Sequence, residues 1–126
     1  MKEFIELTGK NVPSKKNSKI ITKNKRIISS KLVREYEQFA SPLLQQQLTE
    51  WKKMKEGKEN PLKVGFYFYR DSKRKWDFVN IVQVIADLMQ EYLYIPDDDT
   101  KHFIPIYLGE EVVKKDKSGV KFKILD

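Results

Sequence analysis

Lys73–Asp99, KRKWDFVNIVQVIADLMQEYLYIPDDD, is the stretch of sequence that decides the fold. Its apolar residues recur at the three- and four-residue spacing of a helix, and they are Phe78, Ile81, Val82, Ile85, Leu88, Met89 and Tyr92. Asp77 stands immediately before this stripe, and three consecutive acids, Asp97–Asp99, follow it. Because neighbouring like charges repel, the triplet needs solvent or a cation. The pattern predicts a helix over 78–91 with acidic groups at both ends.

The composition of the chain favours an anionic partner. Its 126 residues suit one domain, 1–126, and 25 Lys and Arg against 18 Asp and Glu give a net charge of +7. A basic balance of this kind indicates nucleic acid before membrane. The absence of Cys excludes disulfides and Cys-based zinc sites, and the apolar runs are too short to cross a bilayer. The start MKEFIELTG lacks a signal-peptide core, so we expect a soluble, cytoplasmic protein.

A basic segment lies near the start of the chain. No acid occurs between Glu6 and Glu35, whereas nine Lys and Arg residues do. Turn-forming residues over 11–19 predict a loop, and Ile20–Thr22 with Arg26–Ser29 predicts a hairpin. A solvated basic loop is one interpretation, but charge this one-sided favours nucleic acid. The predicted DNA-binding residues are Lys15, Lys16, Asn17, Lys19, Lys23, Lys25 and Arg26, with Lys73, Arg74 and Lys75 as a second basic group.

The remaining periodicities predict a mixed α/β (α+β) fold. Strands are expected at about 2–9, 61–70, 102–108 and 119–125, and a further helical segment is expected at 30–55. Pro42 lies inside that segment, so a kink or two separate helices are expected there. The expected architecture is a small mixed sheet with two main helical segments packed on it.

Asp77 and the Asp97–Asp99 triplet are the candidate metal ligands, because carboxylate oxygens hold hard cations. A helix over 78–91 is roughly 21 Å long, and residues 92–98 extend over about 23 Å. The chain can therefore just return along the helix to bring Asp98 beside Asp77; otherwise a second subunit supplies half of the site. The simpler alternatives are an N-cap at Asp77 and an exposed acidic turn at the triplet. His102, the only histidine, is expected to be structural.

Three blocks of the sequence resemble the RusA family of Holliday-junction resolvases, small phage- and prophage-associated endodeoxyribonucleases. The blocks are Pro13-Ser14-Lys15-Lys16-Asn17, Asp77-x-x-Asn80-Ile81-x-Gln83-x-x-x-Asp87 and Ile95-Pro96-Asp97-Asp98. The resemblance implies a homodimer of mixed α/β fold that binds four-way DNA junctions and cuts them symmetrically with Mg²⁺ or Mn²⁺. It also implies that Asp77 and Asp98, with Asp97 beside it, are metal ligands. Together with Asn80, whose amide oxygen is a neutral ligand, they are the predicted catalytic residues.

Two positions depart from the family's pattern. Val79 stands where a further aspartate is typical, and Gln83 stands where a basic residue is common. The form D-x-x-N-x-x-Q resembles that of some family members, so the departure is typical of a subgroup. We therefore predict a magnesium-dependent endodeoxyribonuclease that resolves Holliday junctions and related branched DNA. The alternative is a non-catalytic dimer that binds branched DNA and has lost its metal chemistry; a basic structural domain explains the charge but not the spaced acids.

Replacing Lys15 and Lys16 by Ala tests the predicted DNA-binding segment. Each lost phosphate contact reduces counterion release, so the affinity for a four-way junction should fall. The slope of log K against log salt concentration should become shallower by roughly one to two. Fluorescence anisotropy at several salt concentrations measures both quantities. An unchanged slope would move the binding surface elsewhere, with Lys73, Arg74 and Lys75 as the next candidates.

Overall fold

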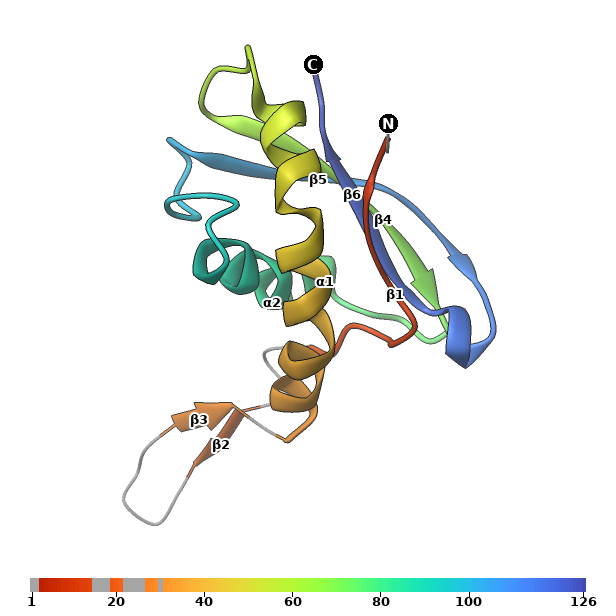
Figure 1. Ribbon diagram of the computed structural model, residues 1–126. Helices are drawn as coiled ribbons and strands as arrows, with labels where there is room; N and C mark the ends of the chain where they lie inside the picture. Colours follow the sequence, from red (N-terminus) through yellow and green to blue (C-terminus); the bar gives the residue numbers. More distant parts are fainter. Residues whose placement is uncertain (1–2, 15–18, 22–26, 30) are drawn as a thin grey trace.

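The computed structural model describes residues 3–14, 19–21, 27–29 and 31–126, and these residues form a four-stranded sheet, a short hairpin and two long helices (Figure 1). The elements in chain order are β1 (Ile5–Thr8), β2 (Lys19–Ile21), β3 (Ile27–Ser29), α1 (Lys31–Lys55), β4 (Leu62–Arg70), α2 (Phe78–Glu91), β5 (Phe103–Val112), the 3₁₀ turn η2 (Lys115–Lys117) and β6 (Gly119–Ile124). The predicted α+β class, a small mixed sheet with two helical segments, is confirmed. Among the described residues, no helix combines the length and apolar character that a membrane span requires.

The main sheet has the strand order β1-β6-β4-β5. β6 pairs antiparallel with both β1 and β4, whereas β4 and β5 are parallel. β2 and β3 form the predicted antiparallel hairpin beside the start of α1, and Thr22 and Arg26 of that prediction lie outside the described residues. β5 extends four residues beyond the predicted strand, because its pairing with β4 continues through a register shift at Phe66/Tyr67.

Both helices pack on the same face of the sheet, where the alternating pattern of β4 places its apolar residues. That face of β4 carries Leu62, Val64, Phe66 and Phe68, all of them buried. Trp51 of α1 contacts Phe122 of β6 at 5.7 Å between ring centroids, and Phe122 is the register partner of Phe66. Phe78 of α2 contacts the ring of Phe66 at 6.5 Å and that of Phe68 at 5.9 Å. One core therefore supports both helices.

α1 is one continuous helix from Lys31 to Lys55, so the predicted alternative of two helices separated at Pro42 is wrong. Pro42 has no N–H to donate to the carbonyl of Gln38, but it is exposed, so water can reach the freed group. The hydroxyl of Ser41 donates to the carbonyl of Glu37 at 2.5 Å, one residue earlier. Packing of the apolar face on both sides of Pro42 keeps the helix intact, because tertiary burial outweighs local propensity.

Gln47, a residue of α1, covers the outer edge of β1 with its side chain. Its side-chain amide accepts a hydrogen bond from the N–H of Glu6 at 2.9 Å and donates one to the carbonyl of Glu6, also at 2.9 Å. The side chain thus satisfies the backbone of β1 as a neighbouring strand would. An edge strand protected in this way does not offer those groups for pairing with another chain.

The loop after α2 is attached to α1 by two buried aromatic residues. The indole N–H of Trp51 donates to the carbonyl of Tyr94 at 2.8 Å, and the hydroxyl of Tyr94 donates to the carbonyl of Leu44 at 2.6 Å. Leu93 has φ = 69°, a left-handed conformation that ends the helix and turns the chain. The N–H of Tyr94 then donates to the carbonyl of Met89 at 2.7 Å. This attachment fixes where the acidic triplet begins.

Tyr94→Phe should lower the free energy of unfolding by about 1–2 kcal/mol, because it removes a buried hydrogen bond at nearly constant volume. Tyr92→Phe is the matched control, since the Tyr92 hydroxyl bonds to the Ser41 hydroxyl at 2.7 Å in a part-buried setting. Urea denaturation of both variants measures the difference. Equal losses in the two variants would show that the Tyr94 hydroxyl contributes nothing beyond a surface contact.

Candidate functional site

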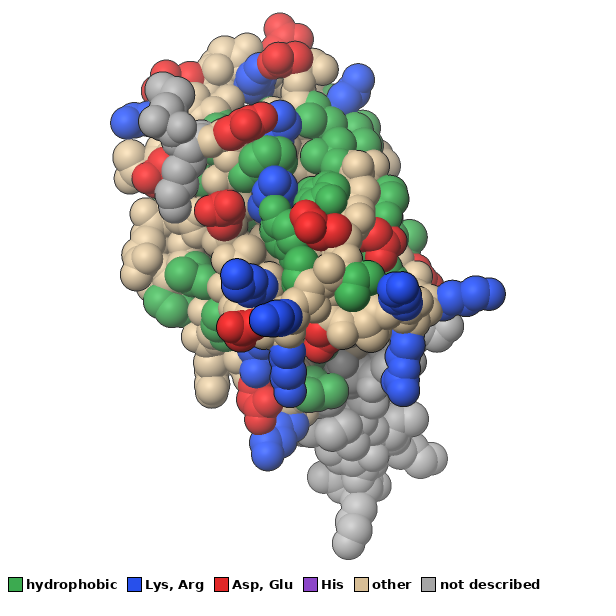
Figure 2. Space-filling view, turned by 90° about the vertical axis from the view of Figure 1, so that its right-hand side faces the viewer, with side chains coloured by type: hydrophobic (Ala, Val, Ile, Leu, Met, Phe, Trp, Pro, Cys, Tyr) green, Lys and Arg blue, Asp and Glu red, His purple; other side chains and the backbone are tan. Residues whose placement is uncertain are grey.

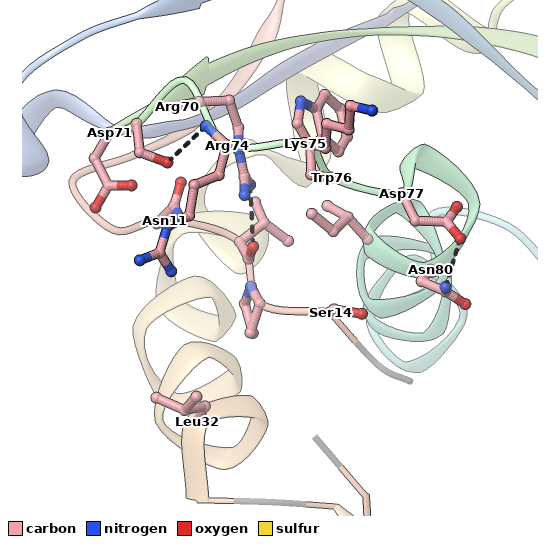
Figure 3. A pocket seen from close by; sticks show the side chains of 14 residues that line it. Asn11, Ser14, Leu32, Arg70, Asp71, Arg74, Lys75, Trp76, Asp77 and Asn80 are labelled. Atoms are coloured by element: carbon pink, nitrogen blue, oxygen red, sulfur yellow. Dashed lines mark hydrogen bonds between the residues drawn. The ribbon is translucent and has the colours of Figure 1, made fainter. Parts of the chain in front are cut away.

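A cleft of about 700 Å³ opens where β4 ends and the chain passes to α2 (Figure 3). Segment 11–14, the connector 70–76 and the first turn of α2 line it. Figure 3 shows Asp77 and Asn80 together on the α2 wall, and Arg70 pointing from the end of β4 toward segment 11–14. The side-chain oxygen of Asn11 in this cleft is buried and has no hydrogen-bond partner among the described residues. The cleft therefore brings Asp77 and Asn80 together with three cations, Arg70, Arg74 and Lys75.

Asp77 is the N-cap of α2, which confirms the simpler interpretation of this residue. One carboxylate oxygen accepts the N–H of Val79 at 3.1 Å, and the other accepts the side-chain amide of Asn80 at 2.8 Å. A carboxylate has about four lone-pair positions, so these two bonds leave it able to bind a cation as well. Because the amide nitrogen of Asn80 faces Asp77, its amide oxygen is left for another partner.

A row of polar side chains continues from Asp77 along α2. Asn80, Gln83 and Asp87 follow at spacings of three, three and four residues, which place all of them on one face of the helix. This row of four residues, with Asp77 as its first member, is called the α2 face. The amide nitrogen of Gln83 lies 2.9 Å from an oxygen of Asp87 and 3.3 Å from an oxygen of Asp98. The loop after α2 thus returns to the helix, but Asp98 meets it at Gln83, six residues after Asp77, and not at Asp77 itself.

The three acids of the triplet have three different environments. Asp97 accepts the N–H of Asp98 at 2.7 Å, which orders the turn. Asp99 accepts the N–H of Lys101 at 3.1 Å and lies 2.7 Å from Nδ1 of His102. The hydrogen bond from His102 holds the pKa of Asp99 below its usual value. Among the described hydrogen bonds, Asp98 is the member of the triplet that is joined to α2, through Gln83.

The donor atoms of this face suit a hard divalent cation, because they are carboxylate and amide oxygens. Among the described residues, however, no group of three or more His, Asp or Glu is close enough to hold a metal ion. Asp98 reaches α2 at Gln83, six residues or about 9 Å along the axis from Asp77. Mg²⁺ is usually bound by one or two carboxylates together with water and phosphate oxygens. The residues therefore fit an ion that the protein and a phosphate hold jointly.

The predicted basic residues fall into two groups. Lys73, Arg74 and Lys75 are exposed, and the latter two line the cleft beside Asp77. Lys15, Lys16, Asn17, Lys23, Lys25 and Arg26 lie outside the described residues, as does the side chain of Lys19 at the start of β2. Figure 2 shows many of the Lys and Arg side chains of this face, mixed with a few acids, gathered in the lower half of the view.

Arg70 and Trp76 belong to the cleft, although the sequence pattern did not single them out. The guanidinium of Arg70 donates to the carbonyl of Val12 at 3.2 Å and lies 4.9 Å from the centroid of the Trp76 ring. Burial lowers the pKa of Arg70, and the nearby carboxylates of Asp71 and Glu110 oppose that shift. The only sequence signal was an arginine that ends an aromatic strand next to a basic connector.

Comparison with known proteins identifies one family. A family model described as Endodeoxyribonuclease RusA matches residues 10–124, a range that includes the whole cleft and every acid of the α2 face. A search of curated proteins finds no match. The match confirms the resemblance that the three sequence blocks carry.

Gln83→Glu tests whether the α2 face attracts a cation. The change removes the amide that links Asp87 to Asp98 and adds a like charge between them, so stability without metal should fall by roughly 0.5–1 kcal/mol. Millimolar magnesium chloride should restore part of that loss, and thermal unfolding with and without the salt measures it. Gln45→Glu, an exposed position on α1, is the matched control. An equal magnesium response in the two variants would argue against a cation site.

Proposed function

The chain belongs to the RusA endodeoxyribonuclease family, whose members resolve Holliday junctions, and on this basis we propose how and where it cuts. The reaction is hydrolysis of a phosphodiester of a four-way DNA junction at the α2 face. The observation that carries the proposal is the return of Asp98 to α2, where it contacts Gln83 in the row that begins at Asp77. RusA family nucleases are metal-dependent; we propose Mg²⁺ as the ion, with Mn²⁺ as a substitute.

In this proposal, Asp77 and Asp98 would hold the ion together, which requires the loop that carries Asp98 to move from Gln83 toward Asp77 when the cation and the phosphate bind. Asn80, already bonded to Asp77, offers its amide oxygen as a neutral ligand, and Asp97 orders the turn that presents Asp98. A bound divalent cation would neutralise charge on the phosphate oxygens as the bond to the leaving oxygen breaks. Lys73, Arg74 and Lys75 hold flanking phosphates, because exposed cations position a nucleic-acid backbone without reading its sequence.

We also propose that the active form is a homodimer. Symmetric cutting of a four-way junction breaks two of its four strands, which a two-fold axis relates, so it requires two sites related in the same way. A single chain contributes one such row. Sedimentation analysis of the protein alone and of its junction complex tests this arrangement, and a complex with one protein chain per junction would contradict it.

A binding-only protein is the second candidate function. Val79 is 68% exposed beside Asp77 and supplies no ligand, and the described acids do not form a group of three. Both observations favour a protein that binds branched DNA without cutting it. Cleavage measurements on substituted proteins separate the two functions.

Asp98→Asn should abolish magnesium-dependent cleavage of a synthetic four-way junction while stability stays equal or rises, because one charge of an acidic triplet is removed. Gel-based cleavage and thermal unfolding measure the two effects. Asp116→Asn, which changes an exposed acid of η2 remote from the triplet in sequence, is the control and should cleave normally. If Asp98→Asn unfolds the protein instead, the residue is a structural bonding partner rather than a metal ligand.

Asn80→Ala and Val79→Asp separate the two candidate functions. If the wild type cleaves, Asn80→Ala should reduce the rate by about 10–100-fold, because a ligand or its positioning bond is lost. If the wild type only binds, Val79→Asp should create cleavage and Asn80→Ala should leave binding unchanged. Strong cleavage that Asn80→Ala does not affect would remove Asn80 from the site. Intact binding without cleavage in all three proteins would favour the binding-only function.

A further inference from the structure

We propose that Arg70 forms a binding site for a DNA phosphodiester in the cleft; this inference rests on the proposed function as a junction-binding protein. Arg70 is the last residue of β4, and the cleft opens directly beyond it. The ligand class is a phosphate of the nucleic-acid backbone, whose oxygens match the planar fork of a guanidinium.

The Arg70 side chain is held on two sides. Its guanidinium lies 4.9 Å from the centroid of the Trp76 ring and donates to the carbonyl of Val12 at 3.2 Å. Trp76 is fixed in turn, because its indole N–H donates to Glu110 at 2.9 Å and its ring packs on Phe68 at 4.7 Å. A cation held in this way loses little further freedom when it binds an anion, and this favours binding.

Arg70 has two carboxylates near it, Asp71 and Glu110, but it forms no direct ion pair with either of them. The bond to Val12 uses one of five guanidinium N–H groups, and in the described part of the chain no salt bridge pairs Arg70 with a carboxylate. Glu110 is close enough to influence the pKa of Arg70, and its two oxygens accept hydrogen bonds from Trp76 and Tyr107, but among the described residues no salt bridge joins it to Arg70. A partly buried cation without a paired anion is costly, so an arriving anion is favoured.

The surroundings identify that anion as a backbone phosphate. Arg74 and Lys75 line the same cleft, so a chain of several phosphates meets more than one cation there. Asp77 and Asn80 occupy the α2 wall of this cleft (Figure 3), so a phosphate on Arg70 would lie in the same cleft as two of the proposed metal ligands. The competing explanation is purely structural: Arg70 ties segment 11–14 to the sheet and contacts no ligand.

The test measures binding, so it does not depend on cleavage. Anisotropy with a labelled four-way junction, in calcium and across a range of salt concentrations, compares wild type, Arg70→Gln, Arg70→Lys and Lys52→Gln. Lys52 is an exposed cation near the C-terminal end of α1, whereas the cleft lies at the N-terminal end of that helix, at Leu32. Lys52→Gln therefore controls for the loss of one positive charge. Arg70→Gln should weaken binding about tenfold and reduce the salt slope by about one. Arg70→Lys should keep the slope but lose several-fold in affinity, and Lys52→Gln should bind as wild type.

Thermal unfolding of each variant separates binding from folding. If Arg70→Gln is folded and matches the wild type in affinity and slope, the phosphate site is overturned. If Arg70→Gln does not fold, NMR of the wild type replaces it. The Nε–H resonance of Arg70 is assigned by its absence in Arg70→Lys, and it is followed while a short oligonucleotide is added. A shift of that resonance supports the site, and its constancy while other resonances move overturns it. Absence of wild-type cleavage would count against the proposed nuclease function alone.

Discussion

The parallel pairing of β4 with β5 is the constraint on which the rest of the structure depends. Parallel neighbours cannot be joined by a tight turn, so residues 71–102 must cross from one end of the sheet to the other. α2 makes that crossing, with Asp77 at one end and the acidic triplet beyond the other. Every acid of the candidate site therefore lies on a single crossover connection, and the cleft forms where that connection leaves β4.

The crossover is useful for chemistry only because its return is fixed. Tyr94 is buried against Trp51 and bonded to the backbone of α1, so the chain leaves α2 at a defined point. From there, the turn ordered by Asp97 brings Asp98 back to Gln83. Burial of two aromatic side chains thus positions an exposed carboxylate that has no core contact of its own. Stability and site geometry are coupled through this one loop.

Sequence periodicity was sufficient for α2 and for most strands, because apolar spacing reports directly which face is buried. It was insufficient at Pro42, where packing of α1 on the sheet outweighs a local helix breaker. The N-cap at Asp77 was predictable from local chemistry, whereas the contact between Asp98 and Gln83 depends on the loop path that Tyr94 fixes. Arg70 could not be found from sequence, because its role arises from contacts with Val12 and Trp76 that no spacing encodes.

The side chains that hydrogen-bond to the acids of the α2 face are neutral amides, so they leave the negative charge of those acids free to attract a cation. Asn80 holds Asp77, and Gln83 holds Asp87 and Asp98, so each carboxylate is oriented by an uncharged donor. A lysine at position 83 would orient the same acids but also cancel one of their charges. An amide leaves the full negative charge for an external cation, while Val79 adds none. Arg70, Arg74 and Lys75 supply positive charge in the cleft that Asp77 and Asn80 also line, so a phosphate there can meet both the cations and the proposed cation ligands.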